Sequence, residues 1–157
     1  MSQITSNTAG IAITAFIIAV AVSMTYYQFM YIPEANKRPV LPKEILNPPE
    51  VTNVRILENS FLQSNPKNFE PKSVRGIIGI SNKVVWTNED TFAHTVTSDE
   101  PAYIDQINGK FDSLAHGTVI GPGETFEFTF TKVGEYHYHC EPHPWMEGTI
   151  EIIENFS

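Results

Sequence analysis

The stretch GPGETFEFTFTKVGEYHYHC, residues 121–140, decides the fold class. Within TFEFTF, the side chains of Phe126, Phe128 and Phe130 alternate with polar ones, which is the period of a β-strand with one buried face. The turn segment GPG precedes this strand, and KVG leads from it into a second alternating segment. The stretch therefore predicts a β-hairpin.

The same alternation recurs on both sides of this hairpin. Strands are predicted at Val51–Leu57, Val74–Ile80, Lys83–Asn88, Phe92–Thr97, Thr125–Thr131, Glu135–Cys140 and Thr149–Ile153. Residues 99–117 are irregular and are expected to form a loop. Short strands without a long amphipathic helix between them predict an all-β sandwich or barrel, with Trp86 and Phe92 in its core.

The N-terminus has a different composition. Residues 1–33 contain no Asp, Glu, Lys or Arg, and the apolar run from Ala9 to Phe29 has the length of about 20 residues that a membrane-spanning helix needs. A cleaved signal peptide is the competing interpretation, but the first ten residues lack the basic start that such a peptide requires. A buried core helix is disfavoured because the run has no polar face. We therefore predict a single transmembrane helix, with an anchor at residues 1–32.

The rest of the chain is long enough for one domain. Five prolines at residues 33–50 predict a semi-rigid, partly extended tether, followed by a folded domain at residues 51–157. The formal net charge of −8 gives no indication of nucleic-acid binding. Lys37, Arg38 and Lys43 follow the apolar run and no basic residue precedes it, so the positive-inside rule alone would leave the domain in the cytoplasm.

A cluster of metal-binding residue types follows the hairpin. Cys140 is the only cysteine, and it begins the motif C-x2-H-x2-M with His143 and Met146. A thiolate, an imidazole and a weak thioether suit copper, and a trigonal site of two histidines and one cysteine with a long axial methionine is a blue-copper geometry. His94, in an upstream strand, is the best candidate for the second histidine.

Two other interpretations of the motif are weaker. A structural free cysteine would explain Cys140 but not the spacing of His143 and Met146. Zinc sites use several cysteines or histidines and seldom a thioether, so zinc is disfavoured. We therefore predict that copper is bound by His94, Cys140, His143 and Met146.

At these motifs the sequence resembles the cupredoxins, and within them the plastocyanins and amicyanins. VVWTNEDTFAHTVTS, residues 84–98, is similar to the strand that carries the family's first ligand, and GEYHYHCEPHPWMEGTIEI, residues 134–152, is similar to its ligand loop. The resemblance covers roughly residues 51–154 and implies a Greek-key β-sandwich with one type 1 copper. His94, Cys140, His143 and Met146 match the family's four ligand positions. The family often has Asn after the first histidine ligand, and whether the hydroxyl of Thr95 replaces it here is open.

Three further histidines are not expected to bind this copper. His137 and His139 alternate with Cys140 along the predicted strand, so they should face away from the site. His116 belongs to a predicted loop. A second metal held by His137 and His139, with help from His116, is the alternative to solvent-facing side chains.

The resemblance implies a protein that carries single electrons between redox protein partners and is not an enzyme. Residues 86–157 hold two basic and thirteen acidic residues, which indicates either ordinary solubility or a surface that attracts a partner with a basic docking face. Glu141 and Glu147 lie beside the ligands. Copper proteins of this family are exported, so we predict a single-pass cell-membrane protein with its copper domain on the extracytoplasmic side, despite the basic residues after the span. A copper-containing subunit of a larger membrane oxidase or reductase complex and a copper carrier remain alternatives.

Overall fold

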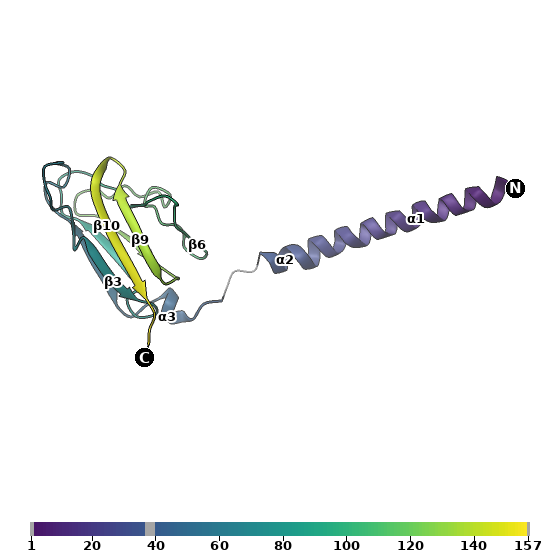
Figure 1. The fold of residues 1–157 in the computed structure, drawn as a ribbon, viewed down its shortest axis with the longest axis horizontal. Coiled ribbons are helices and arrows are strands. Elements are labelled where there is room, and N and C mark those ends of the chain that lie inside the picture. The colour runs from purple at the N-terminus through teal and green to yellow at the C-terminus, as the bar shows by residue number, and fades with distance from the viewer. Residues whose placement is uncertain (1, 37–39, 157) are drawn as a thin grey trace. The chain divides into compact units, whose positions relative to one another are not determined.

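The structure is a computed structural model that describes residues 2–36 and 40–156. The chain divides into two compact units, Met1–Pro39 and Val40–Ser157. The first unit is helical and the second is built of β-strands (Figure 1).

In the N-terminal unit, residues 2–35 form one continuous run of helix. It consists of α1 (Ser2–Tyr26), the π-helical turn η1 (Tyr27–Tyr31) and α2 (Ile32–Ala35). Pro33 directly follows the π-helical turn, and it lacks the N–H that an interior helical position would otherwise donate. Large apolar side chains along α1 are exposed, as at Phe16. Within the described part of the chain, Thr8–Ala35 is the segment that is long and apolar enough to cross a membrane.

The C-terminal unit contains two four-stranded sheets. The first has the order β2 (Phe69–Glu70), β1 (Val51–Ile56), β4 (Lys83–Asn88) and β8 (Thr125–Thr129). The second has the order β3 (Ser73–Ile77), β10 (His143–Ile153), β9 (Gly134–Cys140) and β5 (Thr97–Ser98). A separate ribbon is formed by β6 (Ile104–Asp105) and β7 (Gly109–Lys110).

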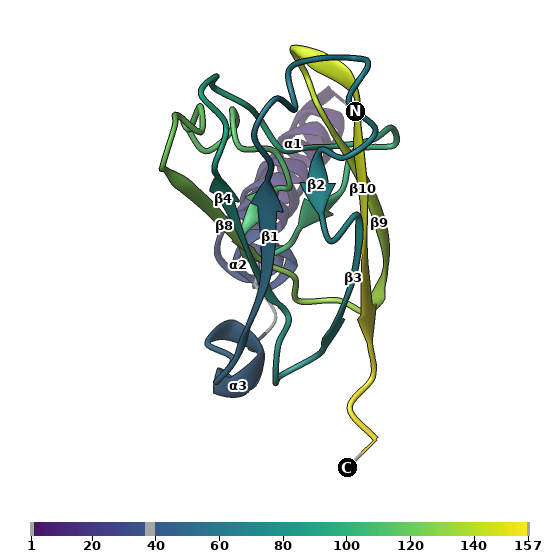
Figure 2. The ribbon, with the colours of Figure 1, turned by 90° about the vertical axis from the view of Figure 1, so that its left-hand side faces the viewer.

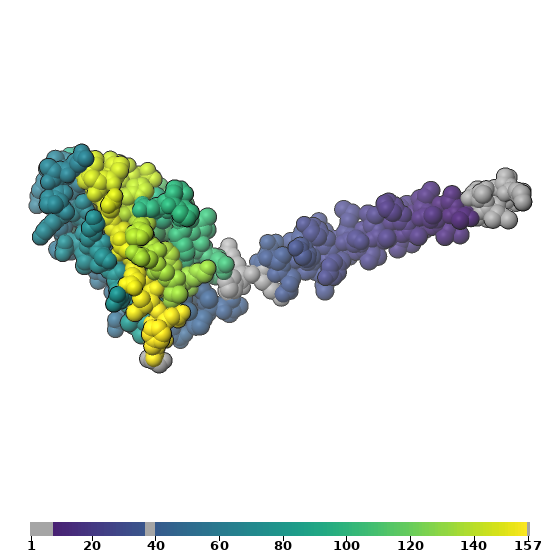
Figure 3. All heavy atoms as spheres, viewed as in Figure 1, coloured from purple at the N-terminus to yellow at the C-terminus, as the bar shows by residue number. Residues whose placement is uncertain are grey.

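Both sheets are mixed. β1 runs parallel to β4 and β3 runs parallel to β10, whereas the other neighbouring strands are antiparallel. β4 and β8 lie on one side of the unit and β9 and β10 on the other (Figure 2). β10 crosses the visible face of this unit as a continuous band (Figure 3). The two sheets and the non-sequential order of their strands confirm the predicted all-β sandwich.

Aromatic side chains fill the space between the two sheets. Trp86 is fully buried, and its ring centroid lies 5.6 Å from those of Phe111 and Tyr138 and 5.7 Å from that of Phe126. The alternation seen in the sequence of β8 therefore points its phenylalanines into this core. The prediction that Phe92 also belongs to the core is wrong, because its side chain is 51% exposed.

Gly148 in β10 allows the ring of Tyr138 in the neighbouring strand to pack directly on its backbone. Gly148 is paired with Tyr138 of β9, and a Cβ atom at this position would collide with the Tyr138 ring. Only glycine leaves room for the ring at this point of the sheet.

The chain enters the sandwich at one end of β4. There α3 (Lys43–Leu46) packs against the domain, since the buried side-chain amide of Asn82 donates to the carbonyl groups of Ile45 and Phe130 at 2.8 and 2.7 Å. The expectation of an unpacked tether is therefore wrong for α3. The opposite end of β4 reaches Asn88, about 20 Å away at the usual rise per residue.

Most predicted strands are confirmed within a few residues. The exception is Phe92–Thr97, where regular pairing is limited to a bridge at His94 and to β5 at Thr97–Ser98. The strand after the ligand motif begins earlier than predicted, at His143 instead of Thr149, because a bulge between His143 and Glu147 keeps it paired with β9.

Candidate metal centre

His94 is fixed by a bridge between two loops at the end of β4. Its backbone N–H donates to the carbonyl of Ile120 at 3.0 Å, and the N–H of Ile120 donates back at 2.9 Å. The side-chain amide of Asn88 also donates to Ile120, at 2.9 Å. The His94 side chain is fully buried, so its ring is held from several sides.

Cys140 lies at the last position of β9, with its sulfur buried beside Thr95. The backbone N–H of Thr95 donates to the sulfur at 3.4 Å, and the Thr95 hydroxyl lies 3.8 Å from it. The same hydroxyl accepts from the N–H of Glu141 at 2.9 Å. Thr95 therefore ties the two ligand segments together, which answers the question left open by the missing asparagine.

His143 returns to Cys140 across a tight turn. The two residues are paired across the β9–β10 connection, with Glu141 and Pro142 between them. The His143 ring is half-buried, and its centroid lies 4.9 Å from that of His94. This ring is the point at which the buried centre approaches the surface.

The three donor atoms form a small triangle. Cys140 Sγ lies 3.7 Å from His94 Nδ1 and 3.6 Å from His143 Nδ1, and all three atoms lie within 4.8 Å of one another. A metal about 2.0 Å from a histidine nitrogen and about 2.3 Å from a thiolate, with an angle of roughly 110–120° between them, separates these donors by about 3.5–3.8 Å. The donor set therefore fits one metal ion without rearrangement.

Burial shifts both fully buried donors toward their neutral forms. It lowers the pKa of His94, although Asp90 beside the ring acts in the opposite direction. It raises the pKa of the Cys140 thiol, although the hydrogen bonds from Thr95 act against this rise. A neutral imidazole is the ligand form of histidine, whereas a metal that binds Cys140 must displace the thiol proton.

Met146, the fourth residue of the predicted set, is fully buried. It follows His143 within the bulge that separates the two paired parts of β10. The bulge interrupts the regular in-and-out alternation of β10 between His143 and Glu147, the part of the strand that contains Met146.

Asp90 is a residue at this centre that the sequence motifs did not single out. Its carboxylate oxygen Oδ2 lies 2.9 Å from Nε2 of His94, on the side of the ring away from Cys140. In the sequence, Asp90 sits in the polar run NED and resembles an ordinary loop residue. Its position four residues before His94 is the one available signal.

The other three histidines lie outside the triangle. His137 is exposed beside Glu135, His139 pairs with Asp99, and His116 lies in a surface turn. Alternation along β9 turns His137 and His139 away from Cys140, as predicted. Among the described residues, His94, Cys140 and His143 are the one group of at least three His, Cys, Asp or Glu donors this close together, so the proposal of a second metal gains no support.

Trp145 lies between the half-buried His143 and the segment that precedes β2. Its ring centroid is 5.3 Å from that of His143, and its indole N–H donates to the carbonyl of Ser60 at 3.2 Å. Pro142 and Pro144 on either side of His143 are exposed. The surface around His143 is thus mainly apolar, with acidic residues at Glu141 and Glu147.

Comparison with known proteins agrees with this geometry. The family described as copper binding proteins, plastocyanin/azurin family, matches residues 59–153. A chloroplastic plastocyanin of Tetradesmus obliquus is 40% identical over 76 residues, covering 48% of this chain and 50% of that protein. Amicyanin of Paracoccus denitrificans is 27% identical over 75 residues, covering 48% and 52%. The chain thus spans about half the length of these curated relatives.

Solved structures show the same fold. A purple cupredoxin from Nitrosopumilus maritimus has a TM-score of 0.52 at 24% identity, covering 65% of this chain and 99% of that one. A copper-containing nitrite reductase from Thermus scotoductus has a TM-score of 0.51 at 24% identity, covering 76% of this chain and 28% of that one. At these identities the likeness concerns the fold alone.

Proposed function

Because the chain belongs to the plastocyanin/azurin family of copper-binding proteins, we propose that it carries single electrons between redox protein partners through one type 1 copper. The observation that carries this proposal is the buried triangle of His94 Nδ1, Cys140 Sγ and His143 Nδ1. Two imidazoles and one thiolate in a triangle are the donor set of a blue-copper site. We further propose that Met146 would supply a fourth, thioether donor, because it is fully buried three residues after His143.

The protein part of the mechanism is to hold the donors still. When bound, copper supplies a one-electron couple between Cu(II) and Cu(I). The bridge at Ile120 fixes His94, and the Thr95 hydroxyl fixes the turn after Cys140, so the donors need little movement when the oxidation state changes. Burial of Cys140 excludes water from the thiolate. The half-buried His143 ring then provides the electron path to a docked partner.

This burial argues against catalysis at this centre and against a copper carrier. An enzyme site keeps an open metal position for its substrate, whereas here three protein donors enclose one point and Met146 is also buried. A subunit of a larger redox complex would need a further catalytic centre outside this donor set. A copper carrier needs a thiol that can exchange its metal, whereas Cys140 is fully buried. The similarity to a nitrite reductase covers 28% of that enzyme and concerns the fold.

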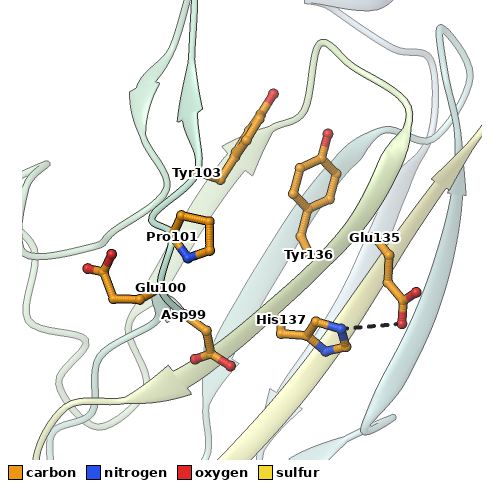
Figure 4. Close-up of a pocket in the computed structure, with 7 residues that line it drawn as sticks. All are labelled: Asp99, Glu100, Pro101, Tyr103, Glu135, Tyr136 and His137. Atoms are coloured by element: carbon orange, nitrogen blue, oxygen red, sulfur yellow. Dashed lines mark ion pairs between the residues drawn. The ribbon is translucent and has the colours of Figure 1, made fainter.

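The acidic side of β9 supports docking of a partner with a basic face. Asp99, Glu100 and Glu135 line a pocket of about 260 Å³ together with His137 and two tyrosines (Figure 4). His139, the residue before Cys140, lies between Asp99 and Glu141. Carboxylates on one surface attract a basic partner and speed its association.

Membrane attachment completes the proposal. The helix at Thr8–Ala35 serves as a single-pass anchor, and the copper domain lies on the extracytoplasmic side of the cell membrane. The length and apolar composition of the helix support the anchor, and the export of related copper proteins supports the side. Protease treatment of intact cells tests it: degradation of the domain without lysis is expected, and protection until lysis would contradict the extracytoplasmic location.

The deciding experiment is spectroscopy of the copper-loaded full chain in detergent. We expect intense visible absorption from thiolate-to-Cu(II) charge transfer and narrow copper hyperfine splitting in the EPR spectrum. C140S should lose the colour, and H137A, which changes an outward-facing histidine, should keep it. A colourless wild-type protein, or a colour that survives in C140S, would refute the proposal.

Docking is tested separately by association kinetics at low salt. E141Q together with E147Q should slow electron transfer from a small basic redox protein, and the difference should shrink as salt is added. A variant that alters the opposite end of the domain, E154Q, serves as the control. Equal rates for the double variant and wild type would remove these two carboxylates from the docking surface.

A further inference from the structure

The carboxylate of Asp90 is buried directly behind a proposed copper ligand. The residue is 2% exposed, and its Oδ2 atom lies 2.9 Å from His94 Nε2. Because His94 Nδ1 faces Cys140, Nε2 is the nitrogen that carries the proton and donates to Asp90. The hydrogen bond therefore sets both the tautomer and the orientation of the ring.

The same carboxylate is held by the backbone of a distant loop. The N–H groups of Asn59 and Phe61 donate to its two oxygens at 3.1 and 3.2 Å, and the N–H of Thr91 donates at 2.7 Å. Asn59 has a φ of +66°, a left-handed conformation in a residue other than glycine. Asp90 thus keeps its place through hydrogen bonds that do not depend on the metal.

This loop also contacts the second histidine indirectly. Ser60, between the two residues that donate to Asp90, accepts the indole N–H of Trp145 at 3.2 Å. The Trp145 ring packs 5.3 Å from the ring of His143. One loop therefore supports His94 through Asp90 and His143 through Trp145.

We propose that Asp90 is a positioning residue that holds His94 in its ligand orientation and lowers the reduction potential of the copper. This inference rests on the proposed function. A carboxylate behind a ligand histidine makes the imidazole a stronger donor. Its negative charge also stabilises Cu(II) more than Cu(I), because the oxidised ion carries the larger charge. Both effects favour the oxidised state.

The expected change in reduction potential can be estimated from other residues that form a hydrogen bond to a metal-binding histidine. Their removal commonly costs about 10- to 100-fold in metal affinity. If Asp90→Asn weakens Cu(II) about tenfold more than Cu(I), the reduction potential rises by about 59 mV for this one-electron couple. Asparagine keeps the shape of the side chain but has one acceptor oxygen in place of two, so the variant removes the charge together with the hydrogen bonds that one of the two oxygens accepts.

The test compares D90N with D105N in the copper-loaded full chain in detergent. Asp105 is also 2% exposed and accepts backbone N–H bonds, from Ile107, Asn108 and Thr131, but it contacts none of the proposed ligands. We expect a higher potential for D90N and an unchanged potential for D105N, whatever either change does to stability. An unchanged or lower potential for D90N, or an equal rise for D105N, would overturn the inference.

A measurement on the wild-type protein covers the case in which D90N does not fold. In the diamagnetic Cu(I) form, NMR should show a downfield, slowly exchanging Nε2 proton on His94. A proton that exchanges freely with water would show that Asp90 does not hold the ring and would overturn the inference. A wild-type protein without a blue-copper spectrum would instead refute the proposed function itself, so the two failures are distinguishable.

Discussion

The hydroxyl of Thr95 offers a sharp test of how the ligand segments are held together. T95V keeps the β-branched shape and removes only the hydroxyl, which accepts from Glu141 N–H at 2.9 Å and lies 3.8 Å from Cys140 Sγ. Thr95 is 2% exposed, so water cannot easily replace the lost partner. A lost hydrogen bond of this kind, with a half-buried N–H left behind, costs about 1–3 kcal/mol of unfolding free energy. A loss of about 2 kcal/mol lowers the Tm of a domain of this size by roughly 8 °C.

The assay is thermal unfolding of the metal-free protein, followed by circular dichroism, with T95S as the matched control. T95S retains a hydroxyl and should unfold much closer to wild type than T95V does. In the copper-loaded protein, T95V should also have a slightly lower reduction potential, because hydrogen bonds to the thiolate favour Cu(I). Equal Tm values for T95V and T95S would show that the hydroxyl does not join the two segments.

Three further predictions concern the sandwich. G148A should lower the unfolding free energy by about 1–3 kcal/mol or more, because the new Cβ collides with Tyr138, and urea unfolding that matches wild type would contradict this contact. N82A should lower the unfolding free energy by about 2–4 kcal/mol in the same assay, because the Asn82 amide donates to the carbonyl groups of Ile45 and Phe130. An unchanged urea midpoint would show that Asn82 does not hold α3 on the domain. Burial tends to raise the pKa of Asp105, but its hydrogen bonds outweigh this and hold the pKa below the ordinary value of 3.8. The ionised Asp105 side chain therefore stabilises the fold above the unfolded pKa of 3.8, and this contribution is lost as the pH falls through the folded pKa. In urea unfolding below about pH 5, the unfolding free energy of wild type should fall more steeply with decreasing pH than that of D105N. An equal pH dependence of the two proteins would refute this.

Local sequence patterns predict the strands and the donor residues where neighbouring side chains alone determine the structure. The alternation in TFEFTF predicts a strand with one buried face, and β8 has that burial pattern. The spacing of Cys140 and His143 predicts that a short turn brings the two residues together, and they are paired across the β9–β10 connection. Pairing between distant strands, such as the parallel contact of β3 with β10, has no local signal. Such contacts follow from the packing of the whole core.

The errors have identifiable physical causes. Phe92 fits an alternating pattern, yet it lies on the surface with its ring centroid 4.2 Å from that of Phe61, because loops and not a strand present His94 to Cys140. Asp90 resembles a solvated turn residue in the sequence, because the groups that it contacts at Asn59 and Phe61 lie about 30 residues away along the chain. The prolines before β1 indicated an extended connector, but α3 forms directly after Pro42 and packs on Asn82.

The position of α3 has a consequence for how this protein can be varied. The chain joins the sandwich at the Asn82 end of β4, and the donor triangle lies beyond the Asn88 end. Substitutions around Asn82 can therefore change how α3 is held on the domain at a point remote from the donor triangle. Within this domain the attachment of α3 and the redox chemistry are separated by the length of β4.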